Sequence, residues 1–171
     1  MSPDIAAAEP PPQECPVGGE RPLTPGEQAL TRSMFGDAID LAPVRIRRRR
    51  FLPFQPARVV MTPRGHLHFH PRSPDYCDDM VTADINVQAL FIHEMTHVWQ
   101  AQQRGEWYLV LMRHPFCRYD YALRPGWKLD RYGIEQQAEI VKHTFLMRRG
   151  KRVRGAPPLA RYESVVPFKP A

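Results

Sequence analysis

The chain lacks the features of a disulfide-built or membrane-spanning protein. Its 171 residues include three cysteines, Cys15, Cys77 and Cys117, and no CxxC pair. This odd, scattered set predicts reduced thiols in a cytosolic protein, with a bond between Cys77 and Cys117 as the alternative. No stretch approaches the roughly 20 consecutive apolar residues that cross a bilayer, so we expect no membrane span.

The start of the chain also lacks a Sec signal. Met1–Ile5 brings no basic start, and no apolar run follows it. A secretory signal needs both, so this segment does not qualify as one. Export by a specialised secretion machine leaves no such mark. We therefore expect a cytoplasmic protein, with export by a specialised secretion system left open.

Positive charge is in modest excess, with a net charge of +6, and part of it lies in one run. Arg45 and Arg47–Arg50 form this run. Nucleic-acid binding is not favoured, because no aromatic residues interleave with the arginines to stack bases. We expect a charged strand edge that discourages aggregation, with docking to an acidic surface of a partner protein as the alternative.

Proline is unevenly distributed and suggests where the domain lies. Residues 1–22 are rich in proline, which predicts a disordered or extended arm. Residues 23–150 are expected to form one domain, for which a hydrophobic fraction of 43% is sufficient. The Pro/Arg-rich tail at 151–171 is expected to be loose unless Val165–Phe168 docks on the body.

Local signals predict several further elements. Thr24, Pro25 and Glu27 form a capping box with proline at the first position, so a helix should begin there and end at Gly36. The other segments are assigned by apolar pattern and turn residues: a strand at 44–51, a hairpin at 58–62 and 65–69, strand or helix at 107–112, and a further strand at 119–123.

His93–His97 reads HEMTH, an HExxH motif, within a segment that should be helical. Asp84 or Asn86 can cap this helix, and Gly105 follows as a stop. Residues four apart share a helical face, so both imidazoles can reach one metal ion and Glu94 lies beside them. The helix is apolar on nearly every face, which predicts burial and makes its polar residues costly without partners. The alternative is a core helix with two hydrogen-bonded histidines.

A second helix is predicted from about residue 132 to 149, ending at Gly150. Glu135, Glu139 and His143 are spaced i, i+4, i+8 and share one face. We assign Glu135 as the third metal ligand and Glu139 as the acceptor of a hydrogen bond from the free N–H of His93. The reverse assignment, and a reading of both glutamates as solvated surface residues, stay open.

Three further histidines, His66, His68 and His70, alternate along the predicted hairpin. On a strand they would face one side together. A solvent-facing polar row is the simpler interpretation, and metal binding is the alternative. A third interpretation is that the hairpin 58–70 binds an extended substrate by β-addition.

The HExxH motif followed by Glu135 and Glu139 resembles the gluzincin type of zinc metallopeptidase. The string from His93 to Gln100, HEMTHVWQ, together with EQQAE at 135–139 and the stretch from Leu23 to Gly36, looks like a narrower group. That group comprises the small metallopeptidase domains associated with Rhs/Vgr proteins, polymorphic toxins and contractile injection systems. The similarity covers roughly residues 23–150. Gluzincins usually carry Asp where this chain has Glu139.

The resemblance implies an α+β, zincin-like fold. A small mixed or antiparallel sheet would pack on the HExxH helix and on a second helix that carries Glu135. It also implies a partner among secretion-system or toxin proteins. The resulting hypothesis is a zinc metallopeptidase with one zinc ion, which hydrolyses a protein or peptide substrate by Glu-assisted attack of zinc-bound water.

In this hypothesis His93, His97 and Glu135 hold the metal, and Glu94 is the general base. An oxyanion donor is also needed, and Tyr132 is our candidate. Tyr119, Tyr121 and His143 stay open for that role. The competing hypothesis is a catalytically silent, zinc-stabilised adaptor that docks on a secretion component, and a weaker one is a nucleic-acid-binding protein.

Overall fold

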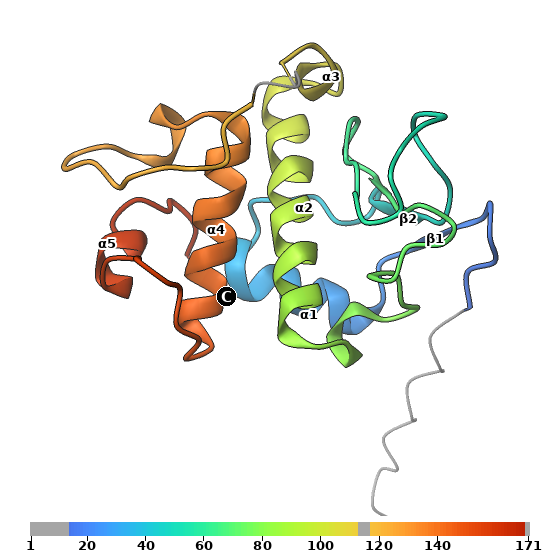
Figure 1. Ribbon diagram of the computed structural model, residues 1–171, viewed down its shortest axis with the longest axis horizontal. Helices are drawn as coiled ribbons and strands as arrows, with labels where there is room; N and C mark the ends of the chain where they lie inside the picture. The colour runs from blue at the N-terminus through green and yellow to red at the C-terminus, as the bar shows by residue number, and fades with distance from the viewer. Residues whose placement is uncertain (1–13, 113–116, 170–171) are drawn as a thin grey trace, which may run out of the picture.

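The computed structural model describes residues 14–112 and 117–169, which form a mixed α+β domain (Figure 1). Helices α2 and α4 lie side by side at its centre and run in opposite directions, with the small sheet beside α2 and helix α5 beside α4. The elements are β1 Glu20–Pro22, α1 Pro25–Phe35, β2 Arg45–Arg47, β3 Leu67–His68, a 3-10 turn Met80–Thr82, α2 Ile85–Arg104, α3 Tyr108–Met112, a 3-10 turn Leu129–Arg131, α4 Ile134–Arg148 and α5 Leu159–Glu163.

The helices begin and end where local capping chemistry predicts. At the start of α1, the Thr24 side chain accepts from the Glu27 N–H, and the Glu27 carboxylate accepts from the Thr24 N–H, so the predicted capping box is confirmed. The Asp84 side chain caps α2 by accepting from two backbone N–H groups, and Gly105 follows the helix with a positive φ of 95°. Helix α4 is slightly shorter than predicted at both ends.

The sheet is mixed and smaller than predicted. Strand β2 pairs antiparallel with β1 and parallel with β3, so β2 is the middle strand. The predicted strand at 44–51 is reduced to three residues, and the predicted hairpin to one bridge between Met61 and His68. The reason is tertiary, because Leu67 and His68 form their strand with β2, and His68 keeps a single bridge to Met61 within 58–62.

The structure also answers two questions that the sequence left about local structure. The segment at 107–112, which was ambiguous, contains helix α3. The segment at 119–123 contains no strand, so that prediction is wrong.

Among the residues that the structure describes, no helix has the length and apolarity that crossing a membrane requires. All three cysteines are free thiols, so the Cys77–Cys117 bond is not formed.

The fold also uses parts of both predicted tails. Cys15 is buried and β1 lies in the sheet, so the predicted arm at 1–22 contributes to the domain from residue 14 onward; residues 1–13 lie outside the described residues. In the C-terminal tail, Val165, Val166 and Phe168 are buried. The ring of Phe168 packs on Phe35 with a centroid distance of 4.8 Å. The segment Val165–Phe168 therefore docks on the body of the domain, which was the alternative to a loose tail.

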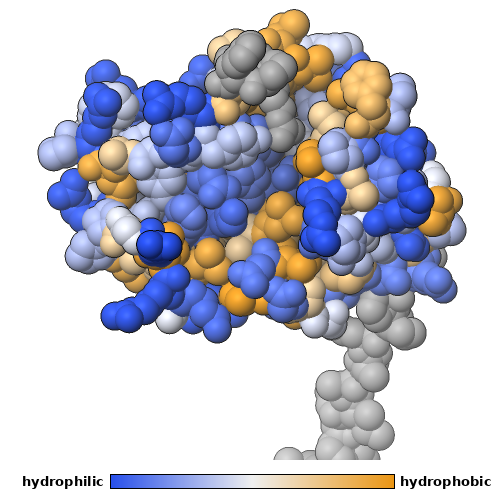
Figure 2. Space-filling view, viewed as in Figure 1, coloured by the Kyte–Doolittle hydropathy of each residue, from blue (hydrophilic) through white to orange (hydrophobic). Residues whose placement is uncertain are grey.

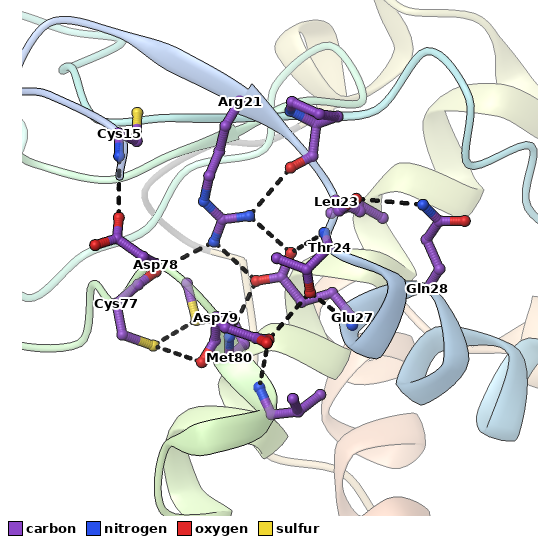
Figure 3. A network of polar contacts seen from close by, with 12 residues as sticks. Cys15, Arg21, Leu23, Thr24, Glu27, Gln28, Cys77, Asp78, Asp79 and Met80 are labelled. Carbon is purple, nitrogen blue, oxygen red and sulfur yellow. Dashed lines mark hydrogen bonds and ion pairs between the residues drawn. The ribbon is translucent and has the colours of Figure 1, made fainter. Parts of the chain in front are cut away.

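A buried ion pair joins β1, α1 and the turn before α2 (Figure 3). The Arg21 guanidinium donates to both carboxylate oxygens of Glu27 at 2.8 Å, and the two side chains are 3% and 0% exposed. Glu27 also accepts from the backbone N–H groups of Thr24 and Met80, and Arg21 donates to the carbonyl of Cys77. The network fixes the segment that leads into α2.

Removal of one partner of this pair should destabilise the domain strongly. Glu27→Ala leaves a buried guanidinium without its carboxylate, which typically costs about 3–5 kcal/mol of unfolding free energy. The matched control is Glu163→Ala, which breaks the more exposed pair with Arg148 and should cost less than about 1 kcal/mol. Denaturant unfolding of both variants measures the difference. Equal losses would show that the Arg21–Glu27 pair contributes little.

Candidate metal centre

Two histidines of α2 and one glutamate of α4 converge in the buried layer between these helices. The Nε2 atoms of His93 and His97 lie 3.4 and 3.2 Å from Glu135 Oε2. The two imidazole rings have a centroid distance of 5.0 Å and an interplanar angle of 79°. All three side chains are buried. The three ligand atoms lie within 4.8 Å of one another, a spacing at which one metal ion can bind all of them.

The helices explain this convergence. His93 and His97 are one turn apart on α2, and both rings point toward α4. Glu135 lies in the first turn of α4, where a carboxylate is favoured by the helix dipole. Glu139 lies one turn further along α4, and its Oε1 is 2.9 Å from Nδ1 of His93, on the side of the ring away from Nε2. The structure thus brings the predicted ligands together and places Glu139 behind His93.

Charges in this cluster shift each other's pKa. Burial by itself lowers the pKa of His93, but the carboxylates of Glu135 and Glu139 outweigh it and raise the pKa to about 9. Burial by itself raises the pKa of Glu139, but the contact with His93 and the charge of Lys142 lower it to about 2. Lys142 Nζ lies 3.1 Å from Glu139 Oε1. The two carboxylates therefore favour the protonated form of His93 in the metal-free domain.

Gln100 orients His97, a role that the sequence-based interpretation missed. Its Nε2 donates to the carbonyl of Ile134 and to Oε1 of Gln137, so its Oε1 is the acceptor for Nδ1–H of His97 at 2.8 Å. This hydrogen bond leaves Nε2 of His97 facing Glu135. The sequence signal for this role was the position of Gln100, three residues after His97 on the same buried helix.

Glu94 lies beside the cluster and is held from the other side. Its Oε2 accepts a hydrogen bond from the Thr62 hydroxyl at 2.6 Å, and both side chains are buried. Figure 2 shows that hydrophilic residues gather in a hollow at the centre of the face formed by α2 and α4, with hydrophobic residues above it around α3. A buried carboxylate next to two imidazoles is the arrangement expected of a general base.

The candidate oxyanion donors differ in what they contact. Tyr119 stacks on His93, with a centroid distance of 6.5 Å and an angle of 15°. Tyr132 lines a cavity of about 490 Å³ together with Glu135, and its hydroxyl accepts from the N–H of Arg124. The Tyr121 hydroxyl is bonded to His143 and to Tyr162. The oxyanion role of Tyr132 stays a prediction.

The other histidines serve the fold. His68 and His70 are buried, so the expected solvent-facing row is wrong. Burial, followed by the charge of Arg47, lowers the pKa of His68 to about 4. The ring of His70 accepts a hydrogen bond from the backbone N–H of Arg72. Among the described residues, His66, His68 and His70 do not form a cluster of metal-ligand atoms.

Several arginines of the basic run make contacts within the domain. Arg47 and Arg49 both pair with Glu20 at 3.0 Å. Arg48 donates to the carbonyl of Cys15 and lies over the ring of Tyr76. These contacts attach the N-terminal segment to β2, so the run acts first as a structural brace.

The fold and the site define a small α+β domain with a buried cluster of two histidines and a glutamate. No family model matches the chain. It is 40% identical over 133 residues to the type VI secretion system spike protein VgrG2b of Pseudomonas aeruginosa; the match covers 74% of this chain and 13% of that protein. The solved effector domain of Pseudomonas aeruginosa VgrG2b has a TM-score of 0.65 and 34% identity, and the match covers 84% of this chain and 80% of that one. The chain therefore belongs to the family of VgrG2b effector domains.

Loss of the Gln100 amide should weaken metal binding. Gln100→Ala removes the acceptor that orients His97, and such a change typically lowers metal affinity about 10- to 100-fold. Gln103→Ala, an exposed change on the same helix, is the control and should leave affinity unchanged. Competition with a chromophoric zinc chelator measures both. Equal affinities in the two variants would remove Gln100 from the site.

Proposed function

We propose that the chain is a zinc-dependent metallopeptidase domain that acts as a secretion-system effector. The observation that carries this proposal is the convergence of His93 Nε2, His97 Nε2 and Glu135 Oε2, with Glu94 beside them. Two imidazoles and one carboxylate form a donor set of catalytic zinc sites, which leave a coordination position open. The donors are two imidazole nitrogens and a carboxylate oxygen, all buried, so a cation would offset the cost of their burial.

The residues around this site have separate chemical roles. When bound, a zinc ion would supply a Lewis acid that polarises an amide carbonyl and lowers the pKa of a water molecule. Glu94 accepts the proton of the attacking water at a carboxylate oxygen and returns it to the leaving amine nitrogen. Gln100 and Glu139 hold the two imidazoles in orientation. Tyr132 is retained as the donor to the developing oxyanion.

The effector part of the proposal is supported by family membership. The curated relative is a spike protein of a type VI secretion system, and the solved relative is described as its effector domain. The match covers 13% of that spike protein. We therefore propose the link to secretion for this domain on the basis of its relatives. A spike or another secretion component is the proposed partner, and a protein or peptide of the target is the proposed substrate.

A second candidate function is a zinc-stabilised adaptor without turnover. One observation favours it: Glu94, His97 and Glu135 are between 1% and 3% exposed, which describes a closed site. A structural zinc site needs no access for substrate. The two candidates therefore share zinc and differ in cleavage.

Glu94→Gln should separate them. The amide keeps the shape of the side chain but accepts no proton, so zinc content should stay at one ion per chain while cleavage of a denatured protein mixture falls by about 100- to 10,000-fold. Glu106→Gln, an exposed change just after α2, is the control and should cleave like the wild type. Equal cleavage by the Glu94 variant would exclude Glu94 as the base. One zinc ion without cleavage in the wild type would favour the adaptor.

His97→Ala should lose the metal. It leaves two donors for zinc and removes the contacts of His97 with Gln100 Oε1 and Glu135 Oε2, so zinc content should fall well below one ion per chain and the thermal midpoint should also fall. His66→Ala is the control and should keep zinc. Metal analysis of the dialysed variants is the measurement. Full occupancy in His97→Ala would move the site elsewhere.

A further inference from the structure

Glu94 is contacted by a residue from a distant part of the chain. Thr62 lies 32 positions before it, in the loop that the bridge between Met61 and His68 closes. The Thr62 hydroxyl donates to Glu94 Oε2 at 2.6 Å, and the two residues are 1% and 3% exposed. Short O–H···O⁻ bonds of this length are charge-assisted and stronger than neutral ones.

The segment that carries Thr62 is held in place on both sides. Met61 and His68 exchange two backbone hydrogen bonds, at 3.1 and 2.8 Å. The guanidinium of Arg64 lies 3.8 Å from the centre of the Trp107 ring, which follows α2. The hydroxyl therefore reaches α2 from a loop that is braced by the bridge to His68 and by the contact of Arg64 with Trp107.

We propose that Thr62 is the positioning residue for Glu94. A carboxylate on a helix can rotate about its terminal torsion with little cost. The hydroxyl binds Oε2 and so fixes the plane of the carboxylate, which leaves Oε1 as the oxygen for proton transfer. The inference rests on the proposed function, because it assigns a role to Thr62 within that reaction. Fixed orientation of a reacting group is worth a large factor in rate.

The kinetic test compares Thr62→Val with Thr62→Ser in the zinc-loaded domain. Valine keeps the shape and removes the donor, so kcat should fall about 10- to 100-fold while KM changes less than about threefold. Serine restores the donor and should bring kcat back to within about threefold of the wild type. Thr31→Val is the matched control, because Thr31 is equally buried but its hydroxyl donates to the backbone carbonyl of Glu27 on α1.

A second test needs no activity. Thr62→Val, Glu94→Met and the double variant form a cycle measured by denaturant unfolding of the metal-free domain. Hydrogen bonds to charged groups predict that Thr62→Val raises the unfolding equilibrium constant about 10- to 100-fold more when Glu94 is present than when Met replaces it. Zinc content of Thr62→Val should stay at one ion per chain.

The two tests distinguish the possible failures. A wild-type domain that binds zinc and cleaves nothing would refute the proposed function, and the unfolding cycle would then decide by itself whether Thr62 holds Glu94. Additive effects in the cycle would overturn the inference. So would a Thr62→Val variant with wild-type kcat, or a Thr62→Ser variant as slow as Thr62→Val.

Discussion

Burial of charged and polar side chains between α2 and α4 is the constraint on which the rest of the structure depends. His93, His97 and Glu135 lie in apolar surroundings, where each would be costly alone. Their ligand atoms therefore face one another, Gln100 binds Nδ1 of His97, and Glu139 Oε1 lies 2.9 Å from Nδ1 of His93. The contacts that pack α2 against α4 are therefore also the contacts that form the candidate site.

The elements around this pair of helices serve to fix it. The buried Arg21–Glu27 pair joins the N-terminal strand to the turn that enters α2. On the other side, Phe168 from the end of the chain packs on Trp99 of α2 with a centroid distance of 5.1 Å. The Thr62 loop closes the third side through Glu94. Segments that are far apart in sequence therefore converge on one helix.

Sequence reasoning succeeded where the signal was local. The capping box at Thr24 and Glu27, and the glycine after each of the first two long helices, fixed α1 and α2. Spacing i, i+4 placed His93 and His97 on one face, and the same rule placed Glu135 and Glu139. The small mixed sheet was expected as a class, but its strands were not, because strand pairing depends on partners that are distant in the chain. The zincin-like assignment stays a prediction.

The sequence by itself indicated the candidate ligands, the candidate base and the helices that carry them, because periodicity and capping act within a few residues. Only the tertiary structure decided which glutamate faces both Nε2 atoms, that Gln100 orients His97, and that Thr62 contacts Glu94. It also decided that His68 and His70 are buried and that the described parts of the two tails, at Cys15 and at Val165–Phe168, contribute buried residues. These outcomes depend on how separate elements pack, and packing distances across the chain are not encoded in any single segment.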